Sequence, residues 1–139
     1  MSILSQREQD AKSRAVGVTQ ILEVAITEAL NSGDKTLATV TGQACLIKSM
    51  VIHSVTAAHA DMTTCAVTGG AAKVIEFIAV ADATEANLDA IDKQVAWTGA
   101  VRLPATKTII MSLVGVGANA ADMIVTIEYE ACVAGGYLV

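Results

Sequence analysis

The chain has 139 residues, of which 53% are hydrophobic and 17% charged, so it is long and apolar enough to fold around a core and is not a disordered segment. A formal net charge of −5 with nine basic residues argues against a surface that binds nucleic acid or an anionic membrane. No apolar run reaches the roughly 18 residues of a membrane-spanning helix, and the start lacks a signal peptide's apolar region, so we expect synthesis in a cytosol.

Residues 1–17 are polar on every side and are expected to form an arm that precedes the domain. Ser5 and Glu8 have the spacing of a capping box, which favours a short helix that begins at Ser5. Such a helix would have no apolar face, so packing would not hold it in a monomer. Two interpretations therefore stay open: a solvated terminus, or an arm that becomes ordered on a neighbouring subunit.

Residues 18–134 are expected to form one all-β domain, a β-sandwich of about eight strands, because short apolar runs alternate with turn signals every 8 to 15 residues. Val18–Leu30 fits both a strand and a helix, and its β-branched residues favour the strand, with Leu22, Val24 and Ile26 on one face. We expect a turn at 31–34 and a strand at 35–41 that returns from it.

Cys45–Thr56 is the longest strand predicted, and it should be central because apolar residues occupy both of its faces. Strict alternation places Cys45, Ile47 and Val51 on one face and Met50 and Ile52 on the other. Two further strands are expected at 62–68 and 73–80, joined by a tight turn at Gly69 and Gly70.

The segment 82–92 breaks the strand pattern and predicts one short helical turn near 83–91. Asp82 is the expected N-cap, with Glu85 three residues later, while Leu88 and Ile91 would pin the turn against the sandwich. Four acidic residues and no base indicate a solvated negative loop. Carboxylates of this kind attract calcium, but their spacing does not match an EF-hand loop.

Two strand-like runs, 95–103 and 108–114, flank the only proline, and we expect them to form a hairpin-like corner with Trp97 buried in the core. A loop at 115–120 and a last strand at 123–133 follow, with Met123, Val125, Ile127 and Tyr129 facing inward. Residues 135–139 are expected to be a tail: a flexible double glycine, then an apolar tip that docks on the domain or on a partner.

No group of residues has the spacing of a catalytic site, a metal site or a cofactor site, so we expect no enzymatic activity, no metal and no cofactor. His53, His59 and Asp61 are too few and too unusually spaced for a metal centre. Glu128 and Glu130 are expected on the outer face of an edge or rim strand, where they would guard against edge pairing.

The three cysteines form no CxxC or CxxxC pair and lie in apolar runs, so each is expected to be a small buried hydrophobe; they are Cys45, Cys65 and Cys132. The aromatic residues, only 3% of the chain, are too few for a sugar-binding platform or for a surface that stacks single-stranded bases.

The segments LATVTGQACLIKSMVIHSVTAA, TCAVTGGAAKVIEFIAVA and WTGAVRLPATKTIIMSLVGVGANAADMIVTIEYEA resemble the small β-sandwich decoration (cement) proteins of tailed-bacteriophage heads. The resemblance covers roughly residues 35–133 and carries over no catalytic residue. It implies a jelly-roll-like fold, a homotrimer placed on the capsid surface, terminal arms that reach neighbouring subunits, the major capsid protein as partner, and synthesis in the host cytoplasm.

Within this interpretation, partner contacts are expected from both termini, at Arg7, Lys12 and Arg14 and at Tyr137, Leu138 and Val139. The alternative is a carbohydrate-binding or host-recognition module, which is also often a β-sandwich. That module would present exposed aromatic side chains at a loop end. A small enzyme of the cupin type would need several inward-facing histidines, and the chain has two.

Overall fold

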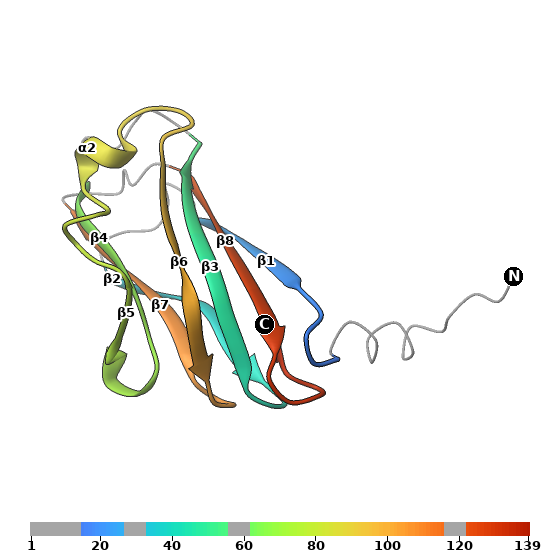
Figure 1. The fold of residues 1–139 in the computed structure, drawn as a ribbon. Coiled ribbons are helices and arrows are strands. Elements are labelled where there is room, and N and C mark those ends of the chain that lie inside the picture. Colours follow the sequence, from blue (N-terminus) through green and yellow to red (C-terminus); the bar gives the residue numbers. More distant parts are fainter. Residues whose placement is uncertain (1–14, 27–32, 56–61, 116–121) are drawn as a thin grey trace, which may run out of the picture.

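The computed structural model describes residues 15–26, 33–55, 62–115 and 122–139 (Figure 1). The helix expected from Ser5 and the loop expected at 115–120, apart from Gly115, lie outside these residues. Strands dominate the described part, with one short α-helix and one 3-10 turn. The elements are β1 (Gln20–Ile26), β2 (Gly33–Thr41), β3 (Cys45–Ser54), β4 (Met62–Gly69), η1 (Ala71–Lys73), β5 (Ile75–Ile78), α2 (Glu85–Leu88), β6 (Gln94–Leu103), β7 (Thr108–Gly115), β8 (Met123–Ala131) and β9 (Tyr137–Leu138).

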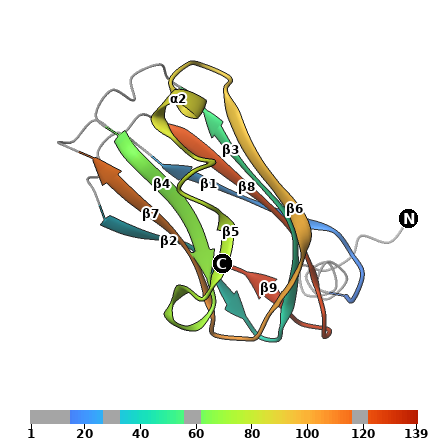
Figure 2. The ribbon, with the colours of Figure 1, turned by 60° about the vertical axis from the view of Figure 1, so that its left-hand side comes forward.

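The strands form two antiparallel sheets packed face to face, as Figures 1 and 2 show. Sheet A has the order β1-β8-β3-β6, and sheet B has the order β5-β4-β7-β2-β9. The expected β-sandwich is therefore confirmed, and β3 is central as its two apolar faces indicated. No described segment forms a helix long and apolar enough to span a membrane.

The core is the space between the sheets, and aliphatic side chains fill it almost alone. Ile47, Met50 and Ile52 of β3 are completely buried, as are Ile109 and Met111 of β7 in the facing sheet. The inward face expected for β8 is correct, because Met123, Val125, Ile127 and Tyr129 are all buried.

Two aromatic side chains, Phe77 and Tyr129, are buried in the core, and Trp97 and Tyr137 pack against it. Trp97 of β6 is partly exposed and packs against the core, where its ring meets Phe77 of β5 edge to face with centroids 4.9 Å apart. This contact joins the edge strands of the two sheets.

A β-bulge corrects the alternation expected along β3. The pairing with β8 shifts register between Ile47 and Ser49, so Lys48 is an extra residue. After it the faces exchange, and Met50 and Ile52 point inward with Cys45 and Ile47 while Val51 is only partly buried. Strict alternation was wrong here because a bulge puts two residues opposite one.

Two expected pairings are also wrong. β2 begins at Gly33, inside the expected turn, and pairs with β7 in the other sheet instead of returning alongside β1. β6 and β7 belong to different sheets, so residues 104–107 make a crossing and not a hairpin. That crossing is held against β2, because Val40 bonds with Lys107 and Thr106 through backbone groups, at 2.8 and 2.7 Å.

The short helix lies inside the expected range but is capped differently. α2 spans Glu85–Leu88 with Thr84 at the N-cap position and no side-chain cap, so Asp82 was the wrong choice. Leu88 is completely buried as expected, whereas Ile91 is 61% exposed because the helix ends before it.

The C-terminal tip packs on its own domain, the first of the two places expected for it. Tyr137 and Leu138 form β9, which pairs with Thr41 and Val40 of β2. Leu138 is buried in the core, and the backbone of Val139 exchanges two hydrogen bonds with Thr39, at 2.8 and 3.1 Å. The chain before β9 passes close to the turn after β2.

That close passage predicts the effect of one substitution. A Cβ added at Gly42 would lie 2.4 Å from the Gly135 carbonyl oxygen, and the φ of Gly42 is +77°. Gly42→Ala should therefore lower the free energy of unfolding by the ~1–2 kcal/mol of left-handed strain and by a further ~1–3 kcal/mol for the clash.

Gly17→Ala is the matched control, since Gly17 has a φ of +80° but no atom within 4 Å of the added Cβ. Urea denaturation of both variants measures the difference. Equal destabilisation would contradict the contact between the turn and the tail.

Candidate functional site

The described residues bring no catalytic or metal-binding cluster together. No group of three or more His, Cys, Asp or Glu in this part of the chain is placed to hold a metal ion. His53 lies on β3, while His59 and Asp61 fall outside the described residues.

His53 instead has a neighbour that its sequence position did not suggest. Its Nε2 lies 2.9 Å from Oδ1 of Asp92, in an exposed hydrogen bond. Beside it, Ser54 is fully buried: its hydroxyl donates to the Leu88 carbonyl at 2.8 Å, and its backbone N–H donates to the Lys93 carbonyl. These hydrogen bonds hold the loop 82–93 against the end of β3. We therefore assign a structural role to the pair formed by His53 and Asp92.

The four acidic residues of the loop are exposed, as expected for a solvated segment, but hydrogen bonds also hold the loop together. Lys93, one residue beyond the range considered, donates to the Ala86 carbonyl at 2.7 Å and pairs with Asp89. Asn87 donates to the Asp82 carbonyl at 2.7 Å. The loop thus carries its own counter-charge and folds back on itself beside α2.

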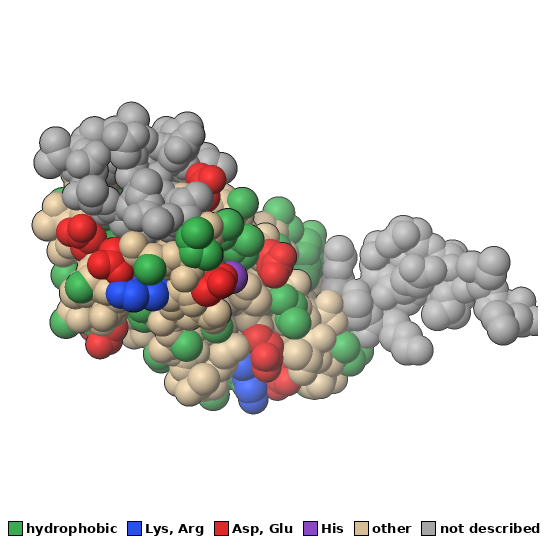
Figure 3. Space-filling model, turned by 90° about the horizontal axis from the view of Figure 1, so that it is seen from above, with side chains coloured by type: hydrophobic (Ala, Val, Ile, Leu, Met, Phe, Trp, Pro, Cys, Tyr) green, Lys and Arg blue, Asp and Glu red, His purple; other side chains and the backbone are tan. Residues whose placement is uncertain are grey.

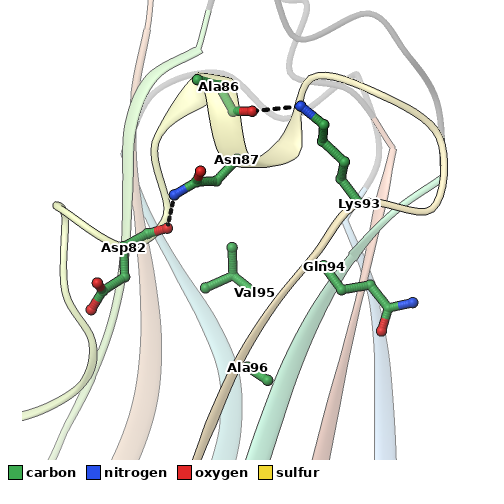
Figure 4. A pocket seen from close by; sticks show the side chains of 7 residues that line it. All are labelled: Asp82, Ala86, Asn87, Lys93, Gln94, Val95 and Ala96. Atoms are coloured by element: carbon green, nitrogen blue, oxygen red, sulfur yellow. Dashed lines mark hydrogen bonds between the residues drawn. The ribbon is translucent and has the colours of Figure 1, made fainter.

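Between this loop and β6 lies a shallow groove with a volume of about 490 Å³, which we call the β6 groove (Figure 4). In Figure 4, Val95 points toward the space under α2, and Lys93 reaches from the start of β6 up to the helix. The groove is lined by Asp82, Ala86, Asn87, Lys93, Gln94, Val95 and Ala96.

The outer face of sheet B carries a second polar cluster that sequence reasoning missed. Ser112 of β7 donates to Asp34 of β2 at 2.7 Å, and Lys73 from the turn after β4 pairs with the same carboxylate. Hydrogen bonds from Lys73 and then Ser112 lower the pKa of Asp34. The three residues are far apart in sequence, so only the sheet order brings them together.

Glu128 and Glu130 lie on the outer face of sheet A, as expected, but not on an edge or rim strand. β8 is an inner strand between β1 and β3. The carboxylates therefore do not guard an edge. Their neighbours across the sheet are Ile21 beside Glu128 and Leu46 beside Glu130, which gives this face a mixed character.

The residues expected to contact a partner divide into two groups. Arg7, Lys12 and Arg14 lie outside the described residues. In β9, Leu138 is buried and Tyr137 is partly buried, whereas the Val139 side chain is 67% exposed. Only Val139 and the exposed part of Tyr137 are thus accessible for a contact from the C-terminal tip.

The surface of the described part is mixed in character. Figure 3 looks onto the end of the sandwich where α2 lies, and there acidic, basic and apolar side chains are interspersed. Exposed apolar side chains are most marked at Val74 after the η1 turn, at the C-terminal Val139 and at Ile21 on β1. None of the four aromatic side chains is more than partly exposed.

The fold has clear counterparts among solved structures. A chain in the acidic stable capsid structure of Helicobacter pylori bacteriophage KHP30 matches with a TM-score of 0.64 and 14% identity, over 90% of this chain and 95% of that chain. A chain in the capsid asymmetric unit of cyanophage Pam1 matches with a TM-score of 0.50 and 12% identity, over 84% and 86%. No protein-family model and no curated protein matches the sequence. At such identities the likeness establishes a common fold.

The cysteines generate a prediction about chemical reactivity. Burial raises the pKa of the Cys65 thiol to about 12, and burial together with the nearby Cys132 raises that of Cys45 to about 11. Cys132 is only partly buried. Because the thiolate is the reactive form, a thiol reagent at pH 8 should modify Cys132 well before the other two.

The number of thiols that react is measured by absorbance with a chromogenic disulfide reagent. We expect one thiol to react quickly in the native protein and all three to react after unfolding. Cys132→Ser should remove the early phase and leave the later ones. Fast native modification of Cys65 would show that the core opens at β4.

Proposed function

We propose that the protein is a non-enzymatic structural component of a bacteriophage head. The observation that carries the proposal is the likeness of fold, over most of both chains, to chains in two phage capsid structures. The matched chain in the KHP30 capsid is also of similar length, since the match covers nine-tenths or more of each. A small domain built from two packed sheets suits a component that carries load in a particle, because most of its described residues are held in strands.

Within that role we propose a decoration (cement) protein on the capsid surface, with the major capsid protein as its partner. The sequence resemblance described above supports this finer assignment. An acidic chain of net charge −5 would avoid packaged DNA and bind protein instead. The proposed homotrimer would multiply weak contacts, because each bound trimer engages several capsid subunits at once.

The jelly-roll assignment belongs to the same proposal. It is supported by the path of the chain, which crosses between the sheets at every connection except β4 to β5, so that the order β1-β8-β3-β6 faces the order β5-β4-β7-β2. Eight strands in two such sheets are the usual jelly-roll content. β9 then extends the edge of sheet B beyond β2.

The alternative of a carbohydrate-binding module has less support from the side chains. Trp97 packs on Phe77, Tyr129 is buried, and Tyr137 is partly covered in β9. None of these rings is presented at a loop end as a flat platform for sugar. We therefore keep glycan binding as an outcome to be tested.

The experiment that tests the proposal is fractionation of particles from cells that produce the protein. Density-gradient bands of assembled heads should contain this chain in a fixed ratio to the main coat protein, by quantitative mass spectrometry. Deleting its gene should leave heads that still assemble but break at lower temperature. Failure to assemble would indicate a coat or scaffold role, and absence from the particle band, with glycan-array binding, would support the alternative.

The expected terminal arm gives a sharper prediction. Removing residues 1–14 should leave the unfolding midpoint unchanged, because the buried core is drawn from residues 26–138. The truncated protein should bind heads that lack it at least tenfold more weakly, since the arm's contacts would be lost. Binding isotherms by co-sedimentation measure the affinity for heads, and a thermal melt measures the unfolding midpoint.

Replacement of Arg7, Lys12 and Arg14 together by Gln is the matched variant, which keeps the length and removes the positive charge. If the truncation weakens binding to heads and the triple Gln variant does not, the arm binds through contacts other than these three positive charges. Unchanged binding in both variants would rule out the arm. Light scattering of each protein measures whether a trimer forms and whether it depends on the same residues.

A further inference from the structure

The free edge of sheet A at the β6 groove is built to take another strand. We propose that residues Gln94–Thr98 of β6 bind an extended, uncharged segment of another protein chain by strand addition. β6 is an outer strand of sheet A, with β3 as its neighbour on one side. The inference rests on the fold and on hydrogen bonding, and it is independent of the proposed role in a phage head.

The register of β6 decides which of its backbone groups are free. Ser54 accepts from the Asp92 N–H and donates to the Lys93 carbonyl, both at 2.9 Å, and Asp92 has a φ of +67°. This bulge begins the β3–β6 ladder, and hydrogen-bonded pairs then recur at every second residue. Ile52 opposite Val95 is the next such pair, and Met50 opposite Trp97 follows.

The intervening residues turn their backbone groups the other way. Gln94, Ala96 and Thr98 therefore direct N–H and C=O groups away from β3, and no hydrogen bond to these groups occurs among the described residues. All three residues are exposed. A row of unpaired donors and acceptors two residues apart is the feature that an added strand recognises.

Two features limit the site to a short length. A register shift between Ile47 and Ser49 places an extra β6 residue near Gly99, which bends the edge below Thr98. At the other end Lys93 turns back to Ala86 and Asp89. Between these limits β6 has no lysine and no proline, the residues that usually protect an edge.

The shape of the groove favours one extended segment as its occupant. Its lining runs along three successive residues of β6, which are Gln94, Val95 and Ala96. The opposite side is formed by α2 and the chain just before it, at Ala86, Asn87 and Asp82. A second sandwich would bring far more bulk against the wall formed by α2.

The side chains define the chemistry of that segment. On the inner side it would meet Val95, Trp97 and Ala86, which favour an apolar side chain. On the outer side it would lie beside Gln94, Ala96 and Thr98, which favour small polar ones. Lys93, just before β6, is engaged with Asp89, and Gln94–Thr98 carry no charge, so this part of the edge does not call for a charged residue in the segment.

The test uses the full chain and a defined probe, the peptide acetyl-Thr-Val-Thr-Val-Thr-amide, titrated to the order of 10 mM because strand addition of a short peptide is weak. Amide chemical shifts and hydrogen exchange are followed by NMR. We expect shifts confined to residues 93–98 and 82–87, with slower exchange of the Ala96 N–H. The same peptide N-methylated at its backbone nitrogens should bind at least tenfold more weakly.

Ala96→Pro should weaken the unmodified peptide at least tenfold, because it removes an outward N–H while the ladder to β3 runs through Val95 and Trp97. Ala96→Ser is the matched control and should bind as the parent does. If the Ala96→Pro protein does not fold, the proposal is tested by comparing the binding of the unmodified and N-methylated peptides to the parent protein. Shifts that map to β1, the other outer strand of sheet A, equal binding of the N-methylated peptide, or no shift at all would each overturn the proposal.

Discussion

Each sheet of this sandwich has to bury one face against the other, and the chain has almost no aromatic bulk with which to do it. Only 3% of its residues are aromatic, so the gap is filled by Ile, Val, Leu and Met. A fully buried side chain of this size contributes about 1.5–3 kcal/mol, but only if its strand keeps the correct face inward. The position of every inner side chain therefore depends on matched alternation across the sheets. Where the chain has one residue too many, as at Lys48, the strand absorbs it as a bulge and the core stays filled.

The same constraint explains what could be predicted from the sequence. A period of two marks any strand with one covered face, so strands were located well, and the inner face of β8 was predicted residue by residue. Pairing was not predictable in this way, because apolar alternation says which side is buried and not which strand lies alongside. β1 and β2 are adjacent in sequence yet belong to different sheets, as do β6 and β7. The bulge in β3 was missed because Lys48 has no glycine or proline beside it to signal an interruption.

The candidate site was hidden for a related reason. Gln94, Val95 and Ala96 have no unusual chemistry, and they matter only because β6 lies at an edge beside α2. Polar contacts behave likewise: His53 meets Asp92, and Lys73 meets Asp34, each across 39 positions of sequence. The residues expected to bind partners were chosen for charge or apolar character near the termini. Of the apolar ones, Leu138 is buried in the protein's own core, whereas the side chain of Val139 is exposed.

The pairing of β1 with β8 has a consequence for how the molecule is made. These strands are separated by about a hundred residues, and β8 lies between β1 and β3 in sheet A. β1 has no partner, and β3 has only one of its two, until the ribosome has released residues 123–131. Folding of sheet A should accordingly be slow and should wait until residues 123–131 have left the ribosome, as high contact order implies. During that interval the apolar strands stay exposed, so yield in cells should depend on chaperone capacity and growth temperature more than on the stability of the finished protein.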